Sequence, residues 1–309
     1  MLISWSQVTI KAGKNSRKPN TMPPHPKFSV LMAVYAKDTP AHLGCALDSI
    51  WANQSVRPDQ IVVVGDGPIT DETAAVLATW QGMLGARFEV LMLPQNRGLG
   101  GALNKGLPLC QHELVARMDA DDRSTPDRFS RQIAFMQAHP YLAASSAWIA
   151  ECDAKLTKIL GHRCPPTTPD ALQRYARLRN PLNHPAAIFR KSAVMALGGY
   201  PEIACEDYAL WSLMLRRRGR IAIQPEVLLH MRTGTEHLHR RGPAFFRGEL
   251  ALLKYQRQIG FLSRFETIRN ALLRGAARLS PVFLRRLAYW TVRQFSRATV
   301  EHSPPSGPL

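Results

Sequence analysis

The chain has 309 residues, of which 45% are hydrophobic and 20% charged, so it can bury a sizeable core and is not a disordered or collagen-like chain. Its longest uncharged stretch, between Arg131 and Glu151, contains glutamine, histidine, proline and serine, which excludes a continuous apolar span across lipid. Five cysteines without a CxxC pair and an N-terminus without an apolar segment predict a cytosolic chain with free thiols.

The net charge of +17 is distributed unevenly along the sequence. Residues 1–27 carry +5, residues 28–210 carry −1 and residues 211–309 carry +13. A dedicated nucleic-acid-binding domain normally carries its excess of Lys and Arg on the folded body. The distribution instead favours a nearly neutral globular domain whose C-terminal part is attracted to an anionic surface.

Residues 1–27 lack hydrophobic periodicity and contain several prolines, so we expect a disordered basic extension. Beyond them, short apolar runs alternate with amphipathic segments. The runs predict strands at 28–35, 60–64, 87–93 and 113–118, and the segments predict helices at 40–54, 71–84 and 98–110. This alternation is typical of a mostly parallel sheet flanked by helices. Right-handed crossovers then place the carboxyl ends of the strands at one edge, where such folds bind ligands.

Three carboxylates, Asp119, Asp121 and Asp122, follow the fourth predicted strand. They repel one another unless a cation or hydrogen bonds compensate. Oxygen ligands of this kind suit Mg²⁺ or Mn²⁺, which would bind a substrate diphosphate at the same time. The alternative is an acidic cap for a helix expected at 126–137. Their position directly after an apolar strand favours the metal site.

The glycine-rich segment Asn96–Gly101 completes neither of the common phosphate-binding motifs. The third glycine of a dinucleotide-binding motif is replaced by Leu103, and no Gly-Lys-Ser/Thr follows. The segment predicts a tight turn that opens a helix, whose N-terminus, with Arg97, can face a phosphate. A turn without a ligand is an equal alternative.

An acidic pair, Glu206 and Asp207, opens a predicted amphipathic helix that ends near Arg217, and the segment Asn180–Pro185 precedes a strand expected at 186–189. Acidic side chains at a helix N-terminus are also favoured by the helix dipole alone. The pair by itself therefore leaves a catalytic and a purely structural interpretation open.

The C-terminal third is basic. We expect a polar loop over a diphosphate or in solvent, containing His230, Arg232, His237, His239, Arg240 and Arg241. Two amphipathic helices have their apolar residues at 261–279 and 283–295, and eight arginines lie among and just after these residues in the stretch 261–297, which favours a membrane interface over packing on the domain. The sequence thus divides into a globular domain at 28–242, a basic helical extension at 243–300 and a disordered tail at 301–309.

Five strings, FSVLMAVYAKD, VVVGDGP, QNRGLGGALNKGL, ARMDADD and GGYPEIACEDYALW, occur in this order. Together they resemble the inverting, nucleotide-sugar-dependent glycosyltransferases of family 2, over about residues 28–241. With RNPLNHPA they are similar to bacterial exopolysaccharide and lipopolysaccharide enzymes of the amylovoran-biosynthesis type. The resemblance implies a GT-A fold and transfer of one sugar to a growing lipid-linked polysaccharide, by a protein peripheral to the inner face of the cytoplasmic membrane.

The resemblance also implies roles for individual residues. The nucleotide-sugar donor would be bound by Tyr35, Asp66, Arg97, Asn104, Asp119 and Arg232. Asp121, together with Asp119, would hold Mg²⁺ or Mn²⁺. Asp207 would deprotonate the acceptor hydroxyl with Glu206 beside it, and His184 and Glu206 would contact the acceptor.

Two departures from common family patterns qualify this assignment. The second loop usually reads Asp-Asp-Gly-Ser and is Gly65–Pro68 here, which leaves Asp66 alone for the base. No QxxRW string follows Trp211, which favours single addition over polymerisation. A sugar-nucleotidyltransferase is an alternative, although the first loop, Tyr35–Asp38, lacks the glycine-rich pattern expected of one. A nucleic-acid-binding protein is the second alternative.

Overall fold

The computed structural model describes residues 25–233 and 243–279. Its strands are β1 (Phe28–Val34), β2 (Gln60–Gly65), β3 (Phe88–Met92), β4 (Leu114–Asp119), β5 (Arg123–Ser124), β6 (Leu142–Cys152), β7 (Ile159–Arg163), β8 (Ile188–Arg190) and β9 (Arg220–Arg232). Its α-helices are α1 (Pro40–Ile50), α2 (Asp71–Leu84), α3 (Gly98–Gly106), α4 (Arg128–Ala138), α5 (Pro169–Ala176), α6 (Lys191–Met195), α7 (Glu206–Arg216), α9 (Pro243–Gln258) and α10 (Arg264–Leu279). The expected extension at 1–27 lies almost wholly outside the described residues.

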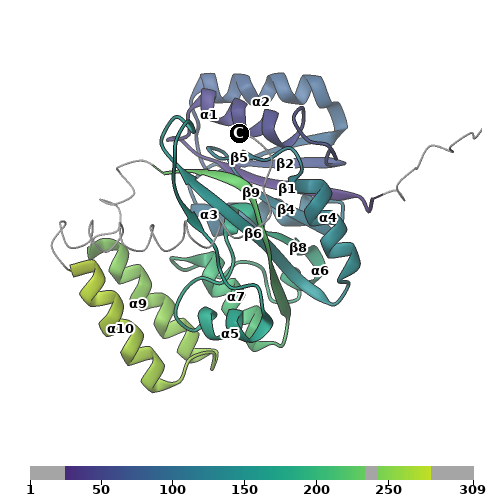
Figure 1. Ribbon diagram of the computed structural model, residues 1–309. Helices are drawn as coiled ribbons and strands as arrows, with labels where there is room; N and C mark the ends of the chain where they lie inside the picture. The colour runs from purple at the N-terminus through teal and green to yellow at the C-terminus, as the bar shows by residue number, and fades with distance from the viewer. Residues whose placement is uncertain (1–24, 234–242, 280–309) are drawn as a thin grey trace, which may run out of the picture.

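The N-terminal half of the sheet is parallel, as predicted. Its strands lie in the order β3-β2-β1-β4, and β1 pairs in parallel with both β2 and β4. Apolar side chains of β1 alternate between two buried clusters: Val30 and Met32 pack with α1, α2 and α4, whereas Leu31 packs with α3 and α7. Figure 1 shows α1 and α2 on one side of these strands and α7 on the other. Both faces of the sheet are therefore covered, and the loops after β1, β2 and β4 meet at one edge.

The second half of the sheet is mixed and was not predicted in detail. β4 pairs antiparallel with β8, and the order continues β8-β6-β9-β5. β6 and β9 run parallel, while the short β5 pairs antiparallel with the end of β9, with Arg123 opposite His230. The prediction of a polar loop is therefore wrong for its first two residues, because His230 and Arg232 belong to β9. The other four residues assigned to that loop lie outside the described residues.

The helix bounds follow from local chemistry. Thr39 and Thr70 precede α1 and α2, and each accepts a hydrogen bond at its hydroxyl from a backbone N–H in the first turn. The helix predicted at 98–110 ends at Gly106 and continues as a short 3₁₀ turn through Pro108, which has no N–H to donate to an α-helix.

The described part of the C-terminal extension is a helical pair. α9 and α10 lie beside each other and below the sheet in Figure 1, next to α5 and α7. Leu252 packs against Tyr208, and the Asn270 side chain donates to the Arg177 carbonyl at 2.7 Å. The helix expected at 261–279 corresponds to α10, which begins at Arg264. The helix expected at 283–295 lies outside the described residues. Among the described helices, none has the length and apolar character needed to cross a bilayer.

Candidate active site

The loops at the carboxyl edge of the parallel strands surround a cavity of about 280 Å³. It is lined by Ala33, Val34, Tyr35, Asp38, Asp66, Asn96, Gly98 and Leu99. Two residues expected to bind the donor, Tyr35 and Asp66, are thus neighbours across this cavity. Gly98 and Leu99 in the first turn of α3 also line the cavity. The glycine-rich segment had predicted a turn that opens a helix at this place.

Asp66 is held in place by the turn that opens α3. Its Oδ1 accepts from the Arg97 N–H at 2.6 Å, and the Asn96 side chain donates to the Asp66 carbonyl at 3.1 Å. Gly67 has a φ of 85°, and a Cβ there would lie 2.7 Å from the Asn96 backbone nitrogen. Only glycine allows the two loops this close approach, which places Arg97 at the start of α3 beside the cavity.

Asp38 also lines the cavity, and no role was predicted for it. Its Oδ2 accepts from the Tyr35 N–H at 2.9 Å. Burial, followed by the negative charges of Asp121 and Asp119, raises the pKa of Asp38 to about 6. The only signal in the sequence was its place directly after the first strand.

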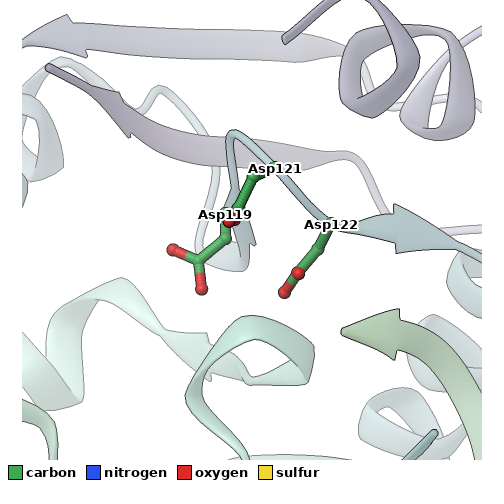
Figure 2. A group of neighbouring side chains, drawn as sticks. All are labelled: Asp119, Asp121 and Asp122. Carbon is green, nitrogen blue, oxygen red and sulfur yellow. The ribbon is translucent and has the colours of Figure 1, made fainter. Parts of the chain in front are cut away.

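Three carboxylates gather on the turn after β4. Figure 2 shows Asp119 and Asp122 directed to the same side of this turn, with Asp121 between them. One oxygen of each lies within 4.8 Å of the others. Asp122 is 1% exposed; its Oδ1 accepts from the Arg232 N–H at 2.8 Å, whereas its Oδ2 has no partner among the described residues. Burial and the other two carboxylates raise the pKa of Asp122 well above its ordinary value.

Buried arginines lie behind this cluster. Arg117 is buried in β4 and forms an ion pair with Asp119. Arg128, also buried, donates to the Arg117 carbonyl at 2.6 Å and to the Ser124 hydroxyl at 3.0 Å, so it orients the strand end rather than pairing with a carboxylate. Within the described residues, one ion pair for three carboxylates leaves negative charge and an unpartnered oxygen. This donor set fits a divalent cation.

The acidic pair lies at the start of α7. The Asn180 side chain donates to Asp207 Oδ2 at 2.6 Å, and the Tyr208 N–H donates to Oδ1 at 2.7 Å. Burial, and next the charge of Asp207, raise the pKa of Glu206 to about 7. A Cβ on Gly100 would lie 2.9 Å from Glu206 Cγ, so the pair abuts the first turn of α3. The structure thus brings the predicted catalytic pair next to the helix that lines the cavity.

Two residues assigned to substrates instead contact the protein itself. His184 is 6% exposed and lies 3.1 Å, by its Nε2, from the Tyr200 hydroxyl, and burial lowers its pKa well below the ordinary value. The Asn104 side chain donates to the Tyr200 carbonyl at 2.8 Å and accepts from the Tyr200 N–H at 2.7 Å. Both hold the loop that leads into α7.

Arg232 contacts the acidic turn from β9. Its Nε donates to the Asp121 carbonyl at 2.8 Å, and its Nη1 donates to the Ala154 carbonyl. The guanidinium therefore stabilises the turn that carries the carboxylates. The structure places Arg232 at this side of the site, as expected, although from a strand.

The sequence matches the family model described as "Glycosyl transferase family 2" over residues 29–198. It is 36% identical over 267 residues to the amylovoran biosynthesis glycosyltransferase AmsE of Erwinia amylovora, covering 85% of this chain and 97% of the relative. It is 35% identical over 271 residues to the Escherichia coli UDP-Gal:alpha-D-GlcNAc-diphosphoundecaprenol beta-1,3-galactosyltransferase, covering 85% of this chain and 95% of the relative.

Solved structures of glycosyltransferases share the fold. S. aureus TarS 1–349 in complex with UDP-GlcNAc aligns with a TM-score of 0.61 at 18% identity, covering 86% of this chain and 79% of that one. The mannosyltransferase PcManGT of Pyrobaculum calidifontis, in complex with GDP-Man and Mn²⁺, aligns with a TM-score of 0.55 at 19% identity, covering 92% and 90%. The predicted GT-A fold is confirmed.

Proposed function

This chain belongs to glycosyltransferase family 2 and is a glycosyltransferase, and from that premise we propose that it transfers one sugar from a nucleotide-diphosphate sugar to a lipid-linked surface polysaccharide of a bacterium. The names of the relatives support this: one belongs to amylovoran biosynthesis, and the other is named for a diphosphoundecaprenol-linked acceptor. Membership of the family favours a glycosyltransferase over a sugar-nucleotidyltransferase and over a nucleic-acid-binding protein.

The nucleotide of the donor occupies the 280 Å³ cavity in this proposal. Tyr35 and Asp66 contact the base, and Arg97 lies at the N-terminus of α3, where a diphosphate is favoured by the helix dipole. Asp121 and Asp119, joined by Asp122, would hold Mg²⁺ or Mn²⁺, which stabilises the charge that builds on the leaving diphosphate.

The proposed reaction proceeds with inversion at the anomeric carbon. The acceptor hydroxyl loses its proton to Asp207 as its oxygen bonds to that carbon. The bond from the same carbon to the diphosphate oxygen breaks on the opposite face, and its electron pair leaves with the nucleoside diphosphate. General-base assistance of this kind contributes roughly 10²- to 10⁴-fold in rate.

One observation carries the proposal more than any other. Glu206, next to Asp207, abuts Gly100 in the first turn of α3, and the preceding residues of that turn line the cavity. The proposed proton acceptor and the cavity therefore both lie beside the N-terminal turn of α3. A transfer reaction needs this arrangement, because the base must reach a hydroxyl that attacks the bound donor.

In this proposal the protein reaches its lipid-linked acceptor at a membrane surface, to which α10 binds. Phe265, Ile268 and Leu272 recur at helical spacing and are 74%, 53% and 70% exposed, with Arg264 also exposed. This combination of apolar and basic side chains fits an anionic bilayer. Fewer arginines than expected take part, because Arg274 and Arg278 turn towards Glu249 of α9. These two side chains stabilise the helical pair instead.

The decisive test of activity incubates purified protein with Mn²⁺ and a panel of nucleotide sugars, and measures release of nucleoside diphosphate with and without a lipid-diphosphate-linked saccharide. Acceptor-dependent release that EDTA abolishes is expected. Release unaffected by EDTA would remove the metal from the proposal. No release with any donor would contradict the donor class.

The membrane surface is tested separately by sedimentation with anionic liposomes. Phe265→Ser combined with Leu272→Ser should abolish binding, because insertion loses its apolar side chains. Met83→Ser is the matched control, since Met83 is 62% exposed on α2. Equal binding of all three proteins would show that α10 does not enter the interface.

A further inference from the structure

Asn180 holds the side chain assigned as the base. Its Nδ2 donates to Asp207 Oδ2 at 2.6 Å, while the Tyr208 N–H occupies Oδ1 at 2.7 Å. The opposite orientation of the amide would point Asn180 Oδ1 at a carboxylate, which is repulsive, so the donor is the nitrogen. Each oxygen of Asp207 keeps lone-pair capacity for one further proton donor.

The other end of the same amide is unsatisfied. Asn180 Oδ1 is shielded from solvent and has no hydrogen-bond partner among the described residues. A buried carbonyl oxygen without a donor is unfavourable and is rare in native proteins. A donor supplied by a bound substrate would satisfy it, and this atom is two bonds away from the group that contacts Asp207.

The backbone conformation of the segment that contains Asn180 is held by contacts other than the hydrogen bond from Asn180 to Asp207. Before it, the Tyr208 hydroxyl donates to the Ala176 carbonyl at 2.6 Å. After it, the Asn183 side chain donates to the carbonyls of Ala147 and Arg163, at 2.8 Å and 3.2 Å. Both ends of residues 177–183 are therefore anchored by other residues, which leaves the Asn180 side chain free for a different task.

We infer that Asn180 is a positioning residue that links the acceptor to the base. Its Nδ2 orients Asp207, and its Oδ1 accepts a hydrogen bond from a second donor on the acceptor saccharide, a hydroxyl or an acetamido N–H adjacent to the attacking hydroxyl. The inference rests on the proposed function, in which Asp207 is the base. It defines the acceptor as a sugar with two neighbouring proton donors, one for each side chain.

The hydrogen bond from Asn180 also affects the pKa of Asp207. Among the described residues, the charged and titratable groups that face Asp207 are Glu206 on α7, Cys205 directly before that helix, Arg117 and Asp119 on β4, and Tyr200. Burial raises the pKa of Asp207, and the hydrogen bonds from Tyr208 and Asn180 lower it. Loss of the Asn180 bond removes a contact that favours the charged base. The acid limb of the pH–rate profile should then move to higher pH.

The test uses the full-length protein with Mn²⁺ and the UDP-sugar it turns over fastest, with water as acceptor and then with GlcNAc linked through a diphosphate to a short lipid. Asn180→Ala should lower kcat/KM for the lipid-linked acceptor by roughly 10- to 100-fold and move the acid limb up by about one pH unit with both acceptors. Asn180→Asp should move it further, since two carboxylates then share the site. The Kd of the UDP-sugar should stay within about twofold of wild type.

Asn183→Ala is the matched control, because it loosens the same segment without touching Asp207. It should lower Tm and leave the acid limb in place. If Asn180→Ala has a wild-type acid limb, or matches Asn183→Ala in every readout, Asn180 is only a structural contact and the inference is overturned. Asp207→Asn distinguishes failure of the proposed function from failure of the inference about Asn180. Full activity of Asp207→Asn would refute Asp207 as the base. If Asp207→Asn is inactive and Asn180→Ala behaves like the wild type, only the inference about Asn180 is refuted.

Discussion

Asp122→Asn should be more stable than the wild type without metal, and should lose all or most of that advantage when metal is added. Asp122 is buried, and one of its oxygens has no partner in the part of the chain that the structure describes, at a cost of about 1–3 kcal/mol for a group of this kind. Asparagine keeps an oxygen for the Arg232 N–H and places an NH₂ group near two carboxylates that can accept from it. In EDTA the variant should therefore be more stable by about 1–3 kcal/mol, and its Tm higher by at least roughly 2 °C.

Saturating metal should shift the difference by about 2.3 kcal/mol towards the wild type, which reverses the order wherever the variant's advantage in EDTA is smaller than that. At 100 times the Kd, Mn²⁺ stabilises the wild type by about 2.7 kcal/mol, whereas a variant whose Kd has risen 100-fold gains only about 0.4 kcal/mol. Thermal denaturation with EDTA and with Mn²⁺ measures both differences. Asp127→Asn is the control, because Asp127 is exposed near the same turn. A variant less stable than wild type in EDTA, or one with an undiminished response to Mn²⁺, would refute the reasoning.

Three further outcomes follow from the acidic pair and its surroundings. Asp207→Asn should lower kcat by roughly 10²- to 10⁴-fold with an unchanged Kd for the donor; loss of donor binding without a change in kcat would make Asp207 a binding residue. Glu206→Gln removes a negative charge that is present only above pH about 7, so the pH–rate profile should change above that pH while the acid limb at lower pH stays in place; an acid limb that moves would contradict this. Gly100→Ala should lower kcat and cost about 1–3 kcal/mol, because its Cβ meets Glu206, whereas Gly82→Ala, with open space around it, should be neutral or stabilising; equal effects would contradict the contact.

The parallel half of the fold could be predicted because its strands are buried on both faces. FSVLMAV and QIVVVG are nearly continuous apolar runs, and the helices between them carry clear caps. β6 was missed because its LAASSAWIAEC sequence is rich in alanine and serine, although nearly all of it is buried. Residues of low hydrophobicity are accommodated there by the close packing of β6 against β9 and β8. No local pattern reports such a contact.

The site was predictable where a residue's role follows from its position in the chain, and not where it depends on distant neighbours. Asp66 and Asp121 follow strands, so their place at the sheet edge could be inferred. His184 looked available in the sequence but is buried beside Tyr200, and Asn180, although part of the string RNPLNHPA, had no predicted role before the structure placed it against Asp207. These contacts join segments that are 16 and 27 residues apart.

The path of β9 has a consequence for exchanging parts between related enzymes. Residues 220–232 lie beyond the matched family region at 29–198, yet the backbone of Arg232 binds Asp122 and its guanidinium binds the carbonyl of Asp121. The turn that carries the carboxylates is therefore completed by a strand from the second half of the chain. A chimera joined near residue 198 would combine this turn with a foreign β9, and its metal affinity would change along with its acceptor. A junction after Thr233 keeps the turn and its strand together, but the exchanged helices must then fit α7 and the Arg177 carbonyl, which α9 and α10 contact.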